Sequence, residues 1–161
     1  MEKTILIAGE LVPTKSNINI FSKGDIKTLL GDDLFSLWKS ADVKVFNLEA
    51  PITNMNKPIK KSGPNISISE NAIFGINSLE PTVISLANNH ILDHGPIGLK
   101  NTMDILDKNA IPYVGVGENL ERARIPYIVH IDDLRLGIYS CAETEFSLAN
   151  TDKPGANPFD V

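Results

Sequence analysis

The chain has 161 residues, of which 42% are hydrophobic and 22% are charged, so it is long enough to build one core of ordinary size. Fifteen Lys and Arg against 20 Asp and Glu give a formal net charge of −5, which argues against non-specific binding to nucleic acid or anionic lipid. The single cysteine excludes an internal disulfide and a cysteine-based zinc site. The apolar run 5–8 is too short for a membrane span or a signal peptide core, which predicts a soluble protein.

Short apolar runs rich in β-branched residues recur along the chain and predict strands. These runs are 4–8, 43–48, 82–87, 112–116, 127–131 and 135–140. The first run is apolar throughout, so we expect a strand that is buried on both faces. Asp132 and Asp133 lie between the last two runs, where they predict a hairpin turn.

Helical periodicity lies between these runs. Asp32 is a candidate N-cap for a helix in which Leu34, Leu37 and Trp38 share one face. A second helix is predicted from Pro96 to near residue 109, and a short one over 119–123. The alternation of strands and helices predicts an α/β fold with a mostly parallel sheet. The long polar stretch 54–69 has the length of a functional loop, and the chain stops in what reads as a loop, so we expect it to be incomplete.

Polar side chains follow three of the predicted strands, at the point where each strand ends. Glu10 follows the first strand, Glu49 the second, and Asn88, Asn89 and His90 the third. Because ligands of open α/β sheets collect at the carboxyl ends of the strands, we expect these groups to converge. Two carboxylates, an amide and an imidazole form a mixed set of ligands suited to Mn, Fe, Zn or Mg.

Other polar residues have plainer interpretations. We expect Glu143 and Glu145 to be solvated loop carboxylates, although both follow a strand end and could face the same cleft. His94 is expected to start a helix, His130 to be a structural strand residue, and Cys141 to be an inert core thiol. The sequence contains no P-loop and no Gly-x-Ser-x-Gly nucleophile elbow.

Several motifs occur in order along nearly the whole chain. They are Ile-Ala-Gly-Glu at 7–10, Val-Phe-Asn-Leu-Glu-Ala-Pro-Ile-Thr at 45–53, Lys-Ser-Gly-Pro-Asn at 61–65, Ser-Leu-Ala-Asn-Asn-His-Ile-Leu-Asp-His-Gly at 85–95, and Gly-Val-Gly at 115–117. Together they resemble the CapA-type family of bacterial capsule and poly-γ-glutamate synthesis proteins.

This resemblance implies a fold similar to the calcineurin-like metallophosphoesterases, a layered αββα sandwich. The chain would form an incomplete N-terminal half of it as a single domain over 1–161. The resemblance also implies a centre of divalent metal ions with Glu10, Glu49 and Asn89 as ligands. It assigns His90 as the general acid near the leaving-group oxygen, and Asp93 as the partner that orients His90.

The same resemblance implies that Lys61 and the backbone of Gly63 meet an anionic group of the substrate, and that Asn88 joins them as a substrate-binding residue. For Lys61, a solvated loop charge is an equally weighted alternative.

Two departures from the family pattern affect this prediction. The first acidic motif is commonly Gly-Asp in the family and is Gly-Glu10 here, which adds one methylene to the ligand. The family also supplies further histidine motifs from its C-terminal half, whereas this sequence has 3 histidines and no Gly-His-x-His. We therefore expect a partial metal centre in a chain that is truncated at its C-terminus.

The leading functional hypothesis is a metal-dependent hydrolase of capsule or poly-γ-glutamate biosynthesis that cleaves a phosphoester or a related anionic bond. The alternatives are a non-catalytic subunit that binds or exports polyglutamate, and an inactive fragment of the family domain. The expected partners are an anionic small molecule or polyglutamate, and either the missing C-terminal half or other capsule-synthesis subunits, but no nucleic acid. The family is often membrane-associated or extracytoplasmic.

Overall fold

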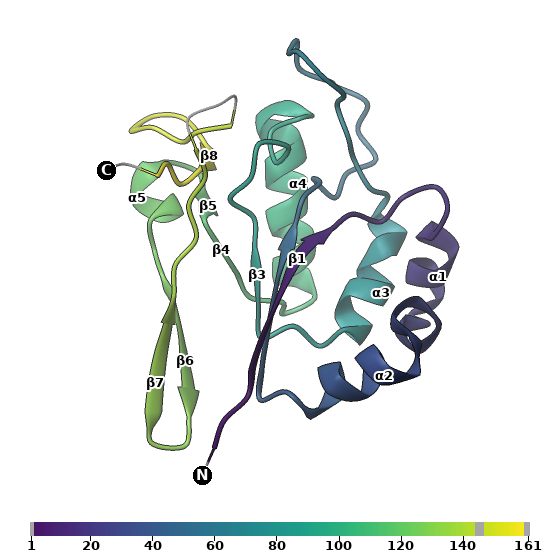
Figure 1. Cartoon of the computed structure of the whole chain (residues 1–161). Coiled ribbons are helices and arrows are strands. Elements are labelled where there is room, and N and C mark those ends of the chain that lie inside the picture. The colour runs from purple at the N-terminus through teal and green to yellow at the C-terminus, as the bar shows by residue number, and fades with distance from the viewer. Residues whose placement is uncertain (1, 144–146, 160–161) are drawn as a thin grey trace.

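A computed structural model describes residues 2–143 and 147–159 of the chain. Four parallel strands form the main sheet, in the order β1-β2-β3-β4 (Figure 1). Their bounds are β1 (Ile5–Leu11), β2 (Val43–Leu48), β3 (Val83–Ser85) and β4 (Tyr113–Val114). Two small antiparallel pairs complete the strands: β5 (Val116–Gly117) with β8 (Gly155–Ala156), and β6 (Tyr127–Ile131) with β7 (Leu134–Ile138).

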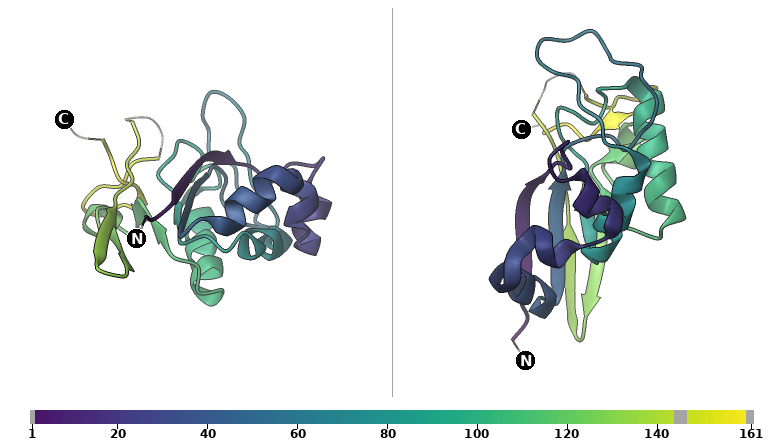
Figure 2. Two further views of the ribbon diagram at one scale, coloured as in Figure 1. Left: turned by 60° about the horizontal axis from the view of Figure 1, so that its bottom comes forward. Right: turned by 90° about the vertical axis from the view of Figure 1, so that its right-hand side faces the viewer.

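The helices that precede β4 cover one face of the main sheet (Figure 2). They are α1 (Ile18–Lys23), α2 (Ile26–Ser40), the 3-10 helix η1 (Glu70–Ala72), α3 (Ile73–Ser78) and α4 (Gly95–Lys108). The short helix α5 (Leu120–Ala123) contacts β5 and β8 instead. The β6–β7 hairpin packs on the other face of the sheet, so the described residues form helix, sheet and ribbon layers.

Alternate residues of the strands build the two cores on either side of the sheet. On β2, Phe46 and Leu48 point into the helix-covered core, while Val43 and Val45 face the β6–β7 hairpin. This double burial explains why β2 is buried along almost its whole length. The predicted α/β fold with a mostly parallel sheet is confirmed.

The expectation that the first strand is buried on both faces is wrong. β1 is an edge strand of the main sheet, and the side chains of Ile5 and Ile7 are 46% and 75% exposed. A continuous apolar run does not show whether a strand has a neighbour on both sides, because that depends on the order of the strands.

Two other predicted elements differ from the structure. Helix α2 begins at Ile26, where the Asp25 side chain accepts a hydrogen bond from the N–H of Thr28, and non-helical Gly31 divides it in two. The helix expected from Asp32 is its second part, which follows Gly31, so the sequence missed only the first part. The predicted strand 112–116 divides at Gly115, whose φ of 85° separates β4 from β5. A glycine with positive φ ends the extended conformation that the apolar pattern predicts.

The hairpin and the later helices agree with the sequence. β6 and β7 pair as predicted, and Asp132 takes a φ of 51° in the turn between them. The predicted helix near 96–109 is α4, and the Asn119 side chain caps α5 by accepting from the N–H of Arg122. Among the described residues, none of the helices is both long and apolar enough to cross a membrane.

Candidate metal and proton-transfer site

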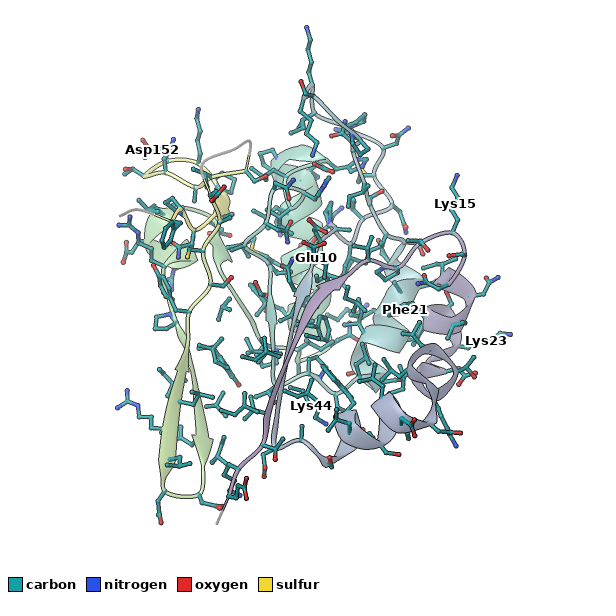
Figure 3. The ribbon with its side chains drawn as sticks, viewed as in Figure 1. Glu10, Lys15, Phe21, Lys23, Lys44 and Asp152 are labelled. Carbon is teal, nitrogen blue, oxygen red and sulfur yellow. The ribbon has the colours of Figure 1, made fainter. Side chains whose placement is uncertain are left out.

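A β-bulge in β1 determines where Glu10 points. The parallel register pairs Ile7 with Val45 but Glu10 with Asn47, so β1 has one more residue than β2 between these two pairs. Because successive side chains of a strand alternate between faces, the extra residue puts Glu10 on the same face as Asn47. Figure 3 shows Glu10 at the carboxyl end of the sheet, and Lys44 lies near the opposite end.

Asn88 connects the ends of β2 and β3. Its amide nitrogen donates to Asn47 Oδ1 at 3.2 Å and to the Leu48 carbonyl at 2.9 Å. Its side-chain oxygen accepts from the backbone N–H of His90 at 3.0 Å. These three hydrogen bonds hold the turn after β3 against the end of β2. They thereby fix the positions of the neighbouring residues Asn89 and His90.

A hollow of about 310 Å³ lies at this end of the sheet, and we call it the strand-end hollow. It is lined by Glu10, Asn47, Glu49, Ala87, Asn88, Asn89, Ala142 and Glu143. The predicted convergence of the strand ends thus holds for Glu10, Glu49, Asn88 and Asn89, whereas His90 is not among the described residues that line the strand-end hollow.

Glu143 reaches the strand-end hollow because contacts on both sides of it hold its segment over the end of β3. Ser140 Oγ lies 2.7 Å from Ser85 Oγ, and Ser147 Oγ donates to the Asn89 carbonyl at 3.0 Å. Glu143 is exposed, as expected of a solvated loop carboxylate, and it also lines the strand-end hollow, as its position after a strand end allowed. Glu145, expected to behave likewise, lies outside the described residues.

Glu10 and Glu49 interact inside the strand-end hollow. Partial burial raises the pKa of the Glu49 carboxyl, and a hydrogen bond and charge repulsion from Glu10 raise it further. Two carboxyl groups in such contact do not both ionise readily. A cation between them would remove this repulsion.

A buried cluster of three side chains lies next to the strand-end hollow, and we call it the Lys61–Asp93–His90 cluster. Nδ1 of His90 lies 2.6 Å from Asp93 Oδ2, and Lys61 Nζ pairs with Asp93 Oδ1. Lys61 Nζ also lies 3.3 Å from Nδ1 of His90. The side chains of Lys61 and Asp93 are 2% and 0% exposed, whereas His90 is 15% exposed.

This arrangement places the predicted site residues in different surroundings. The contact expected between His90 and Asp93 is present. The Lys61 ammonium is buried against Asp93, so it is not a solvated loop charge, and Gly63 is exposed on the loop with a φ of 86°. His94 is the N-cap residue of α4 and accepts a hydrogen bond from the N–H of Lys57, as expected for a helix-start residue.

The side chains in the strand-end hollow fit a hard divalent cation only in part. Glu10, Glu49 and Asn89 would supply oxygen ligands, which suit Mg²⁺ or Mn²⁺ better than a soft metal. Across residues 2–143 and 147–159, however, no three His, Cys, Asp or Glu side chains are grouped closely enough to hold a metal ion. These ligands therefore suit one ion that keeps some coordination positions open for water or substrate better than they suit a pair of ions.

Comparison with known proteins identifies the family. The sequence model of the family described as bacterial capsule synthesis protein PGA_cap matches residues 4–160, nearly the whole chain. The chain belongs to this capsule synthesis family.

Curated relatives agree with the PGA_cap match. The capsule biosynthesis protein CapA of Bacillus anthracis is 28% identical over 123 residues, which are 73% of this chain and 30% of the relative. A probable polyglutamine synthesis accessory protein of Mycobacterium tuberculosis is 32% identical over 122 residues, covering 72% of this chain and 32% of the relative. The PGA biosynthesis protein CapA of Bacillus subtilis is 29% identical over 90 residues, 55% of this chain and 23% of the relative. The chain thus spans about a third or less of these relatives.

Proposed function

We propose that this PGA_cap chain serves capsule or poly-γ-glutamate biosynthesis as a cation-dependent hydrolase of a phosphoester or a related anionic bond. The strand-end hollow is its reacting centre. The observation that carries the proposal is the convergence of the Glu10–Glu49 pair with the His90–Asp93 contact at one end of the parallel sheet.

The charge of the strand-end hollow supports the proposal that a cation takes part. Glu10, Glu49 and Glu143 line the strand-end hollow, and among the residues that the structure describes no lysine or arginine does. An anionic substrate would be repelled from this surface unless a bound cation offset the carboxylates. Glu10, Glu49 and Asn89 would hold the cation, which, when bound, supplies a Lewis acid for the substrate oxygen and an activated water.

The side chains beside the strand-end hollow would handle the proton. Asp93 engages Nδ1 of His90, which leaves Nε2 as the ring nitrogen for proton donation to a leaving-group oxygen. Asn88 keeps His90 in place through the backbone N–H of that residue. Asn88 would then act on substrate by positioning its neighbours, because its own amide already makes three hydrogen bonds within the protein.

Non-catalytic binding of polyglutamate is the second candidate function. The exposed side chains of Lys57 and Lys60, on the loop that also carries Lys61, favour it, since they could meet the carboxylates of a polymer. In that case binding would not require a divalent cation.

Two measurements on the 161-residue chain test these functions. Hydrolysis of a panel of phosphomonoesters and phosphodiesters is measured after chelation and after addition of Mn²⁺ or Mg²⁺. We expect cation-dependent turnover that Asn89→Ala and His90→Ala abolish, and full activity in either variant would refute the site. Calorimetric titration with polyglutamate completes the test. Cation-independent binding without hydrolysis would establish the second function, and neither activity would indicate an inactive fragment.

A further inference from the structure

Lys61 is inaccessible to a ligand in the strand-end hollow. Its side chain is 2% exposed, and it is absent from the residues that line that hollow. Lysine is almost never this deeply buried unless its charge is paired, and Asp93 supplies the opposite charge. The adjacent Lys60, in contrast, is exposed to solvent.

Both oxygens of Asp93 are occupied by groups that fix its orientation. Oδ2 accepts from the backbone N–H of Ile66 at 2.7 Å and contacts Nδ1 of His90 at 2.6 Å, while Oδ1 faces the Lys61 ammonium. A fully buried carboxylate that lost its cation would carry an uncompensated charge, and its surroundings would have to rearrange to offset it. His90 is bonded to Oδ2 of this carboxylate, so a rearrangement of Asp93 would change the surroundings of the imidazole directly.

Hydrogen bonds of the loop over residues 54–69 hold Lys61 beside Asp93. The backbone N–H of Ile59 donates to the Asp93 carbonyl at 2.9 Å, and that of Lys57 donates to His94 Nδ1 at 3.1 Å. Together with the Ile66 contact, these bonds hold both sides of the loop against the turn that precedes α4. The loop is thus anchored to the same turn that carries His90 and Asp93.

We propose that Lys61 is a positioning residue that holds His90 mainly through its ion pair with Asp93, aided by its own 3.3 Å contact with Nδ1 of His90, and that it makes no contact with substrate. This inference deepens the proposed function and rests on it for the catalytic role of His90. It reassigns Lys61 from substrate binding to support of the proton-transfer group. The loop 54–69 then serves to bring a cation to a buried carboxylate.

The test that needs no catalysis is the nitrogen spectrum of the histidine rings. In ¹⁵N-labelled, chelator-treated protein at one fixed pH, Lys61→Met is expected to change the ring signals of His90 and to leave those of His130 unchanged. Lys60→Met, at the neighbouring exposed lysine, is the matched control and should leave all ring signals as in the wild type. Unaltered His90 signals in folded Lys61→Met would overturn the inference.

A double-mutant cycle keeps the inference testable if Lys61→Met fails to fold. The double variant Lys61→Met/Asp93→Asn removes both buried charges together, and it is compared with Asp93→Asn alone. Because Lys61 also contacts Nδ1 of His90 directly, these two proteins should differ in their His90 ring signals, but by less than Asp93→Asn differs from the wild type. An effect of Lys61→Met in the Asp93→Asn background as large as that of Asp93→Asn itself would show that Lys61 acts mainly by another route and would overturn the inference.

Kinetics separates positioning from substrate contact. Lys61→Met is expected to lower kcat by about 10- to 100-fold, the range for loss of an outer-shell partner, with little change in KM. A raised KM with unchanged kcat would instead show substrate contact and overturn the inference. If the wild type hydrolyses nothing, the proposed function fails, while the ring spectra still decide whether Lys61 positions His90.

Discussion

Glu10 and Asn47 are register partners across the β1–β2 ladder because one extra residue bulges from β1 between Ile7 and Glu10. Without this bulge, the side-chain alternation would direct Glu10 to the helix-covered face of the sheet, away from Glu49. The local backbone irregularity therefore creates the contact between the two carboxyl groups. The bulge also allows the carboxyl group of Glu10, in the Gly9-Glu10 motif, to lie beside Glu49.

The contact between the two glutamates predicts a change in acid–base behaviour. Glu10→Gln should lower the pKa of Glu49 in cation-free protein, because it removes the charge repulsion that adds to the effect of burial. ¹³C NMR titration of the Glu49 carboxyl would measure the change. An unaltered titration of Glu49 in Glu10→Gln would mean that burial alone raises this pKa.

The same pair makes stability depend on pH. A carboxyl group whose pKa is raised by folding stabilises the folded state below its ordinary pKa of 4.5. This stabilisation is lost as pH rises through the folded-state pKa. Glu10→Gln should therefore lose less stability than the wild type between pH 4.5 and neutrality. Urea unfolding at several pH values would test this, and parallel pH profiles of the two proteins would contradict it.

Divalent cations should stabilise the folded chain through Glu10 and Glu49. A cation at about 100 times its Kd adds about 2.7 kcal/mol to the free energy of unfolding, which raises Tm by roughly 5 to 10 °C for a domain of this size. Thermal unfolding with and without Mn²⁺ would show the shift. Glu49→Gln should abolish it, whereas Glu121→Gln on α5, outside the residues that line the strand-end hollow, should retain it. Equal shifts in both variants would argue against this site.

The backbone turn at Gly115 should tolerate no side chain. Its φ is 85°, and a Cβ there would lie 2.7 Å from the Cβ of Ala87 and 2.9 Å from that of Ser140. Gly115→Ala should cost about 2 to 4 kcal/mol, from the left-handed backbone and the overpacking together. Gly137→Ala in β7 is the matched control, because its nearest neighbour would be Ile128 Cδ1 at 3.6 Å. Urea unfolding that ranks the two variants equally would contradict this account.

An ion-pair network around Glu80 should make the stability of the fold fall in acid. Glu80 binds Lys39 at 2.7 Å and Lys44 at 3.5 Å, and Lys39 is the main cause of its lowered pKa. Such a group contributes stability above pH 4.5, and this contribution is lost as pH falls through the folded-state pKa. Glu80→Gln should therefore show a weaker loss of stability in acid, and Lys39→Met should flatten the profile in the same direction. Thermal unfolding between pH 3 and 7 would check this. A steep acid profile retained in both variants would exclude the network.

The loss of folding stability at alkaline pH should depend in part on Tyr113. Burial, followed by the nearby Asp107 carboxylate, raises the pKa of Tyr113 to about 12 from 10.0. The stability that Tyr113 contributes is complete below pH 10.0 and is lost as pH rises toward about 12. Tyr113→Phe should lose less stability over this interval, as followed by chemical unfolding. Identical alkaline profiles of the variant and the wild type would rule out this role.

Some features follow from local sequence. The hairpin turn at Asp132 and the capped start of α5 at Asn119 are determined by residues within a few positions of each other, and the structure matches both. The α1 and α3 helices were missed, because each has only 6 residues and so offers too little periodicity to detect. The exposure of Ile7 was also missed, since it depends on which strand lies at the edge.

The amino-acid sequence by itself determined the α/β class, the family and the strand-end positions of Glu10, Glu49 and Asn89, because apolar periodicity and short motifs are local properties of the chain. Only the tertiary structure decided that Glu143 joins the strand-end hollow and that Lys61 is buried against Asp93. Both outcomes depend on how distant loops pack over the end of the sheet. Such contacts between residues far apart in sequence leave no local pattern from which they could be predicted.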